Sequence, residues 1–141
     1  MADLPDELRA LVVDHIGIAV NDLDEASEVY NLLGLEPTHP DEVIKSQNVK
    51  VRVYQLGETM LELLEATSDN SPIAKYIAKK GPGIHHFALR VANLESEIAR
   101  LLELGARFIN TEPRAGRANS RIVFLHPKWS KGILIELVEH K

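Results

Sequence analysis

Two histidines and two glutamates occupy repeated places in this sequence. His15 and His86 each open an apolar run, and they are 71 residues apart. Glu62 and Glu136 each interrupt an apolar segment, and they are 74 residues apart. Imidazole nitrogens and carboxylate oxygens both accept protons and bind metal ions. The repetition therefore predicts acid–base or metal chemistry to which two halves of the chain contribute alike.

The residues that flank these four positions favour a metal site. Side chains alternate faces along a strand, so His15 shares a face with the small residues Gly17 and Ala19. The large apolar neighbours of Glu62 and Glu136 point away from each carboxylate. Burial of an ionised carboxylate is costly unless it is paired or bound to a metal. A mixed N/O donor set suits a divalent ion, with Zn, Co, Mn, Ni and Fe(II) all open. The expected ligands are His15, Glu62, His86 and Glu136.

A single strand histidine or glutamate is more often structural than functional, and the repetition is what separates these four residues from others of their type. His85 neighbours His86 but points the opposite way, so we expect a structural or supporting role for it. Three further histidines have no counterpart in the other half. We assign no ligand role to His39, His126 and His140.

The helices that position these residues follow the same repeat. After each histidine run, apolar residues recur at helical spacing and stop at Gly34 or Gly105. Asp22 and Asn93 stand at the expected helix starts, where a side-chain oxygen caps the first backbone N–H groups. Glycine just past the last turn suits a left-handed C-terminal cap. Each half is thus predicted to place a helix directly after its first strand.

Apolar alternation at 49–53 and an apolar run at 121–125 predict further strands, which gives a β-α-β-β-β order in each half. A short helix with Ser71 as its N-cap joins the halves and ends at Gly81. The segment 111–120, in which Gly116 and two arginines stand among small polar residues, is expected to be an exposed loop. The predicted fold class is α+β. We expect one domain over 1–141, with module one at about 12–66, a linker helix at about 71–81 and module two at about 83–139.

Composition limits the classes of function. A chain of 141 residues with 45% hydrophobic content can bury one ordinary core. Its formal net charge of −5, with both signs interspersed, argues against a protein that coats nucleic acid. The absence of cysteine excludes disulfides, thiolate metal sites and a cysteine nucleophile. No segment has the apolar length of a membrane span and Met1–Ala10 lacks a signal-peptide core, so we expect a cytoplasmic protein.

Several motifs together resemble the vicinal oxygen chelate superfamily, whose paired βαβββ modules form a cupped mixed sheet around one metal ion. The resemblance extends from Val13 to Glu139. Within the superfamily, the sequence is most similar to the methylmalonyl-CoA epimerase family. The similar motifs are Asp14–Val20, Glu62–Glu65, Ser71–Ala74, Gly83–His86 and Phe124–Lys128. The resemblance implies metal-dependent interconversion of the 2R and 2S forms of methylmalonyl-CoA, a step in propionyl-CoA metabolism.

That reaction removes a proton from C2, which lies between a thioester and a carboxylate. A metal that binds one oxygen of each group would stabilise the resulting enolate. Epimerisation also requires bases on both faces of the planar intermediate. The resemblance assigns one base to Glu136. Some relatives carry the other base at a strand position where this sequence has Val51. We therefore assign the second base to Glu62, which the repeat would set across the metal from Glu136.

The CoA part of such a substrate requires cationic or hydrogen-bonding groups at the mouth of the cup. Lys128 lies within a family-like motif and is the first candidate, and Arg121 is a further one. Three other basic residues lie in or near the segment 111–120: Arg114, Arg117 and Lys131. Relatives commonly form dimers, so the resemblance also implies a homodimer. No nucleic-acid or membrane partner is expected.

The nearest alternative is lactoylglutathione lyase (glyoxalase I), whose bacterial members use the same kind of ligand set for a related proton transfer. The segments Gly83–His86 and Phe124–Lys128 favour the epimerase. Ring-cleaving dioxygenases of the superfamily usually keep three ligands, so a fourth candidate ligand, Glu62, argues against them. A drug-binding module without catalysis would be expected to lack the metal ligands.

Overall fold

The computed structural model describes residues 12–141, which divide into two compact units. The N-terminal unit comprises His15–His85, and the C-terminal unit comprises the described residues 12–14 and 86–141. The expectation about Met1–Ala10 lies outside the described residues. Organisation of all 141 residues as one domain, with the module boundaries given above, stays a prediction.

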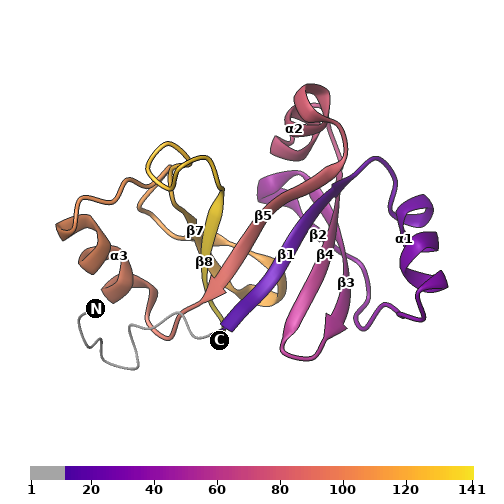
Figure 1. Cartoon of the computed structure of the whole chain (residues 1–141), viewed down its shortest axis with the longest axis horizontal. Coiled ribbons are helices and arrows are strands. Elements are labelled where there is room, and N and C mark those ends of the chain that lie inside the picture. Colours follow the sequence, from indigo (N-terminus) through magenta and orange to yellow (C-terminus); the bar gives the residue numbers. More distant parts are fainter. Residues whose placement is uncertain (1–11) are drawn as a thin grey trace. The chain divides into compact units, whose positions relative to one another are not determined.

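The N-terminal unit contains four strands, one helix between the first two strands and a second helix after the last (Figure 1). Its elements are β1 (Val12–Val20, of which 12–14 belong to the C-terminal unit), α1 (Leu23–Leu32), β2 (Glu42–Ile44), a short 3-10 helix η2 (Lys45–Gln47), β3 (Val49–Leu56), β4 (Thr59–Ala66) and α2 (Pro72–Lys80). The strand order is β2-β3-β4-β1. β1 and β4 are parallel, and the other neighbours are antiparallel.

The C-terminal unit repeats this arrangement. Its elements are β5 (Gly83–Arg90, of which 83–85 belong to the N-terminal unit), α3 (Leu94–Glu103), β6 (Arg114–Ala115), a short 3-10 helix η3 (Arg117–Asn119), β7 (Arg121–Phe124) and β8 (Ile135–Glu139). The strand order is β5-β8-β7-β6, with β5 and β8 parallel and the remaining neighbours antiparallel. The α+β class and the duplicated βαβββ order are confirmed. The segment 111–120 is more structured than expected, because β6 pairs with β7 and η3 follows it.

The predicted helix caps are present. Asp22 Oδ1 accepts a hydrogen bond from Glu25 N at 2.9 Å, and Asn93 Oδ1 accepts one from Ser96 N at 2.9 Å. Gly34 and Gly105 follow the last turns with positive φ, as a left-handed end requires. Among the helices described within residues 12–141, none has the length and apolarity that a membrane crossing requires.

The linker helix α2 also begins and ends as predicted. Ser71 Oγ accepts a hydrogen bond from Ile73 N at 3.2 Å, and Pro72 is the first helical residue, where a missing N–H costs nothing. Gly81 N donates to Ile77 O at 2.8 Å, and Gly81 has φ +75°. A side-chain cap at Ser71 and the backbone conformation of Gly81 thus define the two ends of a helix that packs against β4.

The two helices of the N-terminal unit pack on opposite faces of its strands (Figure 1). On one face, Ile18 and Val20 of β1 pack with Tyr54 and residues of α1. On the other face, Ala19 packs in a cluster with the β3 valines and Ile73 of α2. The alternation predicted for β1 is therefore confirmed, and His15 lies on the α2 face.

A second pair of repeated glutamates, which sequence reasoning missed, holds the helices onto the strands. Glu65 Oε1 of β4 accepts a hydrogen bond from Leu23 N, the first residue of α1, at 2.8 Å. Glu139 Oε1 of β8 accepts one from Leu94 N, the first residue of α3, at 2.7 Å. A carboxylate at a helix N-terminus accepts a hydrogen bond from an otherwise unpaired N–H. Its negative charge also interacts favourably with the positive end of the helix dipole. Each glutamate follows a candidate ligand by three positions, so it lies on the opposite face of the strand.

Candidate active site

The N-terminal unit brings His15 and Glu62 together. The parallel register of β1 and β4 sets Gly17 beside Glu62, so His15 lies diagonally across from the carboxylate. His15 Nδ1 is 3.5 Å from Glu62 Oε2. Both residues are buried, with His15 5% and Glu62 6% exposed. Gly17, which lies directly beside Glu62, places no side chain on this face.

The C-terminal unit builds the same diagonal pair. Ala88 of β5 lies beside Glu136 of β8, and His86 Nε2 is 3.3 Å from Glu136 Oε1. Both side chains are buried. The Phe124 ring meets the His86 imidazole edge-on, with centroids 5.4 Å apart at 85°. Phe124 also lies opposite Glu136 in the β7–β8 register, so it forms an apolar wall beside the pair.

Each pair, taken by itself, fits two neighbouring ligands of one metal ion. Two donors about 2.1 Å from a common ion, at an angle of about 100°, are separated by about 3.2 Å. The N···O separations of 3.5 Å in one unit and 3.3 Å in the other are close to that value. Each donor comes from a buried side chain of a type that binds divalent ions. The residues present therefore suit a metal with N/O ligands.

Two further residues share the face of His15 and Glu62. Val51, which the sequence comparison set at a base position of the family, is 1% exposed and lies within the apolar cluster on the α2 face. Glu42 of β2 lies directly opposite Val51 in the antiparallel register, and Ile44, two residues on, packs in the same cluster. Among the described strand residues of the N-terminal unit, Glu42 and Glu62 are the carboxylates on this face.

The candidate substrate contacts lie in different surroundings. Lys128 is exposed in the turn between β7 and β8, where its backbone N donates to His126 Nδ1 at 3.1 Å. Arg121 of β7 lies beside Glu139 of β8. Its guanidinium donates to Glu95 Oε1 at 2.9 Å and to Glu139 Oε2 at 3.4 Å. Hydrogen bonds from Arg121 lower the pKa of Glu95. Arg121 is thus held against α3, on the face opposite Glu136, and its substrate role stays a prediction.

The other basic candidates and histidines also have definite places. Arg114 lies on β6 and Arg117 on η3, while Lys131 is exposed in the β7–β8 turn. His39 Nδ1 is 3.0 Å from Thr38 Oγ1, and the His85 ring meets Tyr76 edge-on at 4.9 Å. The structural or supporting role of His85 and the absence of a ligand role for His39 stay predictions.

An ionic cluster near the C-terminus was not predicted. Asp14 is fully buried, and its Oδ1 accepts a hydrogen bond from Arg90 Nε at 2.9 Å and lies 2.6 Å from His140 Nε2. All three residues belong to the C-terminal unit. The cluster joins the start of β1, the end of β5 and the chain end, which are remote in sequence. A periodicity argument cannot find such a cluster because its members recur at no fixed spacing.

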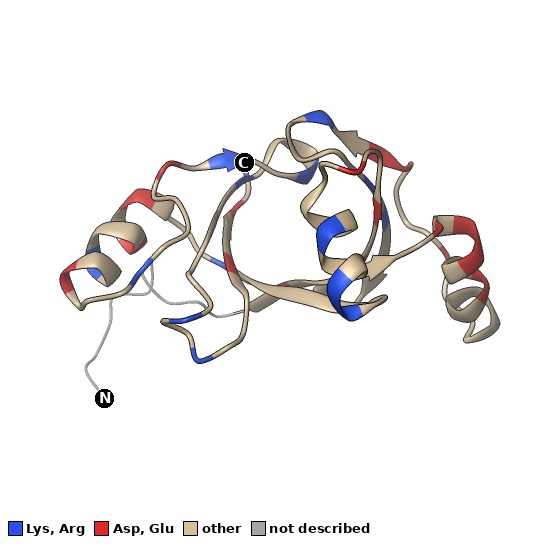
Figure 2. Cartoon of the chain, turned by 90° about the horizontal axis from the view of Figure 1, so that it is seen from above, with Lys and Arg blue, Asp and Glu red and all other residues tan. Residues whose placement is uncertain are grey.

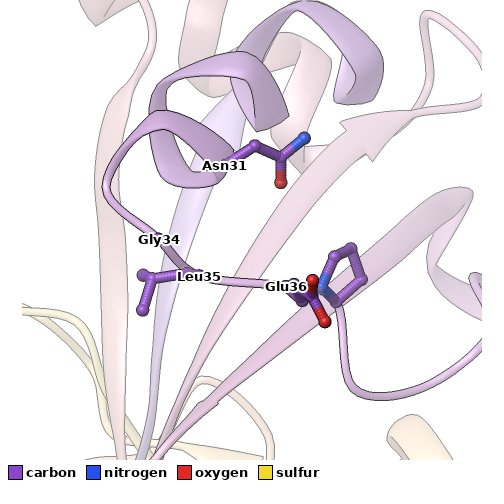
Figure 3. A pocket seen from close by; sticks show the side chains of 5 residues that line it. Asn31, Gly34, Leu35 and Glu36 are labelled. Atoms are coloured by element: carbon purple, nitrogen blue, oxygen red, sulfur yellow. The ribbon is translucent and has the colours of Figure 1, made fainter.

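A surface hollow follows α1 and is lined by residues of the N-terminal unit (Figure 3). Its lining residues are Asn31, Gly34, Leu35, Glu36 and Pro37. Leu35 packs in the cluster between α1 and the strands, on the face opposite His15 and Glu62. The hollow is therefore separate from the His–Glu pair of its unit.

Comparison with known proteins identifies the family. The family model described as the Glyoxalase/Bleomycin resistance protein/Dioxygenase superfamily matches residues 14–124. The ethylmalonyl-CoA/methylmalonyl-CoA epimerase of Cereibacter sphaeroides is 38% identical over 128 residues, which cover 89% of this chain and 95% of that protein. The crystal structure of methylmalonyl-CoA epimerase from Mycobacterium tuberculosis matches with a TM-score of 0.87 and 40% identity, over 92% of this chain and 87% of that one.

A further solved structure, of methylmalonyl-CoA epimerase in complex with methylmalonyl-CoA and NH4+, matches with a TM-score of 0.85 and 40% identity. The match covers 90% of this chain and 92% of that chain. The resemblance inferred from the motifs is confirmed. The chain belongs to the Glyoxalase/Bleomycin resistance protein/Dioxygenase superfamily and, within it, to the family of the methylmalonyl-CoA epimerases.

Proposed function

We propose that this chain interconverts (2R)- and (2S)-methylmalonyl-CoA by removing and returning the proton at C2. The observation that carries the proposal is the buried His–Glu pair built at the same register in both units. Membership of the epimerase family supports the same reaction. One ethylmalonyl-CoA/methylmalonyl-CoA epimerase is among the relatives, so we include 2-ethylmalonyl-CoA in the expected substrate class.

The chain's own residues supply the proton transfers. In one direction, the Glu136 carboxylate takes the proton from C2, and the electron pair of the C–H bond passes into the adjacent carbonyl system. The protonated Glu62 carboxyl then delivers its proton to C2 from the opposite face, which inverts the centre. The reverse direction exchanges the two roles. Burial of both carboxylates excludes the water that would otherwise compete for the reacting proton.

We propose that the two pairs hold one divalent ion between them, with His15, Glu62, His86 and Glu136 as ligands. The ligand types and the burial of His15, His86 and Glu136 support a metal site. When bound, the ion would supply Lewis-acid stabilisation of the negative charge that develops as the proton leaves. Co, Mn, Ni and Zn all suit the donors. Glu62 and Glu136 would each serve both as a ligand of the ion and as a base.

The remaining parts of the proposal concern the substrate's CoA portion and the assembly. We propose Lys128 and, with less support from its surroundings, Arg121 as contacts for phosphate or carboxylate groups. Solved structures of family members include a complex with methylmalonyl-CoA, which supports binding of an acyl-CoA thioester. A homodimer and a cytoplasmic location stay predictions of the sequence.

Proton NMR in D2O tests the reaction directly. Metal-loaded protein is incubated with (2R)- or (2S)-methylmalonyl-CoA while the C2 proton and the epimer ratio are followed. We expect deuterium at C2 together with conversion of one epimer into the other, and loss of both after treatment with a chelator. Absence of exchange with each of the four metals would contradict the epimerase assignment. Turnover of the methylglyoxal–glutathione hemithioacetal in the same samples would favour glyoxalase I instead.

A further inference from the structure

The helix α2 covers part of the face on which His15 and Glu62 lie. Ile73, Tyr76 and Ile77 of α2 pack against the apolar cluster that includes Leu64 and Ala66 of β4. Leu64 and Ala66 share a face with Glu62 because side chains alternate along the strand. Ala66 is four residues from Glu62, about 13 Å along an extended strand. The helix therefore lies at one end of a surface whose other end carries the candidate ligands of this unit.

The charge of α2 is positive throughout. The helix, Pro72–Lys80, contains three lysines and no acidic residue, whereas α1 contains three acidic residues and no basic one. Figure 2 shows the resulting contrast between the blue positions of α2 and the red positions of α1. All three lysines are exposed: Lys75, Lys79 and Lys80. The exposed side of α2, opposite Ile73 and Ile77 that pack on the strands, is thus locally positive even though the whole chain is negative.

Helix stability explains only part of this charge. Lys79 and Lys80 stand in the last turn, where cations interact favourably with the helix dipole. Lys80 Nζ also lies 5.8 Å from the centroid of the Tyr76 ring. Lys75 lies in the middle of the helix, where the dipole offers little, and Lys79 follows it by one turn on the same side. Among the described residues, neither Lys75 nor Lys79 forms an ion pair with a carboxylate.

We propose that Lys75 and Lys79 bind the phosphate groups of the CoA thioester. This proposal rests on the proposed function. The long uncharged pantetheine arm would run along the face from Glu62 and past α2 to the exposed side of the helix, which separates the reacting acyl group from the charged nucleotide end. Two ammonium groups one helical turn apart match a ligand that carries several phosphate oxygens. The lysines would then determine recognition of the carrier and take no part in the proton transfer.

Substrate truncation separates this role from a structural one. The variant Lys75→Ala/Lys79→Ala is compared with the unchanged chain on methylmalonyl-CoA and on methylmalonyl-pantetheine, which lacks the nucleotide phosphates. Lys50→Ala is the matched control, because Lys50 is a partly exposed lysine of the same unit on the α1 face, 4.0 Å from Asp41. Calorimetry with CoA alone measures binding without turnover, and circular dichroism verifies the fold.

We expect the double variant to raise KM for methylmalonyl-CoA about tenfold with kcat unchanged, which corresponds to about 1.4 kcal/mol of binding. KM for the pantetheine thioester should not change. The affinity for CoA alone should fall by the same factor of about ten. Added salt should weaken CoA binding to the unchanged chain more than to the variant. Equal losses on both thioesters, an unchanged KM for methylmalonyl-CoA, or the same effect in Lys50→Ala would overturn the proposal. If the unchanged chain exchanges neither substrate, the proposed function itself fails, whereas calorimetry still decides whether these lysines bind CoA.

Discussion

The helices α1 and α3 occupy equivalent places in the two repeats, yet they pack on their strands through different side chains. On α3, Ile98 packs with Val123 of β7 and Leu137 of β8 in an apolar cluster. Ser27 of α1 is the equivalent of Ile98, and Arg52 of β3 is the equivalent of Val123, each 71 residues earlier. There, Arg52 Nη1 donates to Ser27 Oγ at 2.8 Å. A polar contact thus stands where the other repeat has a hydrophobic one.

Arg52 extends this polar layer toward the segment before β2. Its Nε and Nη2 donate to the two carboxylate oxygens of Asp41 at 2.9 and 2.8 Å, and Nη2 is 3.0 Å from Asp24 Oδ1. Farther along β3, Tyr54 OH donates to Asn31 of α1 at 3.2 Å. The face that carries histidine and glutamate keeps its pattern in both repeats, while on the α1 face of the N-terminal unit a polar contact lies beside the apolar cluster. In each unit the His–Glu pair lies on one face of the strands, and the opposite face packs against α1 or α3.

The largest expected effect tests whether the two His–Glu pairs are chemically equivalent. We expect Glu136→Gln and Glu62→Gln each to lower epimerisation by about 10²–10⁴-fold, because each variant lacks a base on one face of C2. Each variant should still exchange the C2 proton of one epimer with deuterium without inverting it, and the two variants should act on opposite epimers. NMR on the separate epimers measures this, with metal content determined in parallel.

Glu42→Gln is the matched control, since Glu42 lies on the same face as Glu62 but outside the His–Glu pair. Unchanged turnover in Glu62→Gln with intact metal binding would remove Glu62 as a base. If Glu42→Gln instead shows one-sided exchange, the second base belongs to the position opposite Val51.

The next effect tests the polar helix contact. We expect Arg52→Met to lower the free energy of unfolding by about 1–3 kcal/mol, since it leaves Asp41 and the buried Ser27 without their donor. Hydrogen bonds from Arg52 hold the pKa of Asp41 below its ordinary value of 3.8. The stability from this contact is therefore full above about pH 4 and is lost as pH falls through the lowered pKa. Urea unfolding between pH 7 and 3 should show a smaller acid-induced loss in Arg52→Met. An equal loss in both proteins would refute the linkage.

A smaller effect is expected at the helix N-termini. Glu65→Ala and Glu139→Ala each remove a carboxylate that accepts from the first backbone N–H of a helix, at a cost of about 1 kcal/mol. Glu139→Ala should be the more destabilising, because Glu139 also accepts from Arg121. Thermal unfolding compares both with Glu103→Ala, an exposed control at the end of α3. Variants that match the control would show that the caps contribute nothing.

The smallest effect concerns the predicted substrate contacts. Lys128→Ala is expected to raise KM several-fold, and Arg121→Ala by less, because Glu95 and Glu139 already hold the Arg121 guanidinium. Loss of Arg121 should also return the pKa of Glu95 upward to its ordinary value, because hydrogen bonds from Arg121 are the main cause of its lowering. Carbon-detected NMR titration of the carboxylates measures that shift. A larger KM effect at Arg121 than at Lys128 would reverse the ranking of the two residues.

Most of the repeat could be predicted because its features depend on residues that are close together in the sequence. The histidine runs, the caps at Asp22 and Asn93 and the bounds of α2 depend on neighbours within a few residues. The offset also changes from 71 to 74 between the histidines and the terminal glutamates, and the structure locates the extra residues in the longer β7–β8 turn. The helices and the longer strands therefore followed from periodicity and capping residues.

The elements and contacts that escaped prediction depend on partners distant in sequence. β2 and β6 are short, and each is defined by pairing with its neighbour rather than by its own pattern. Arg52 stands among alternating valines, so its spacing gives no sign that it connects β3 to α1 and to the segment before β2. Glu65 and Glu139 do recur in the repeat, and the offset of 74 that marked Glu62 and Glu136 would have found them as well.

The pairs Glu62/Glu65 and Glu136/Glu139 also restrict how this fold can evolve. Within each terminal strand, one glutamate faces the histidine and the other reaches a helix, because three steps along a strand reverse the face. Insertion or deletion of a single residue between the two would turn both carboxylates to one side and lose either the site or the helix cap. Length changes among homologues should therefore collect in the turn that already differs between the repeats, and the three-residue interval should survive where the surrounding sequence has drifted.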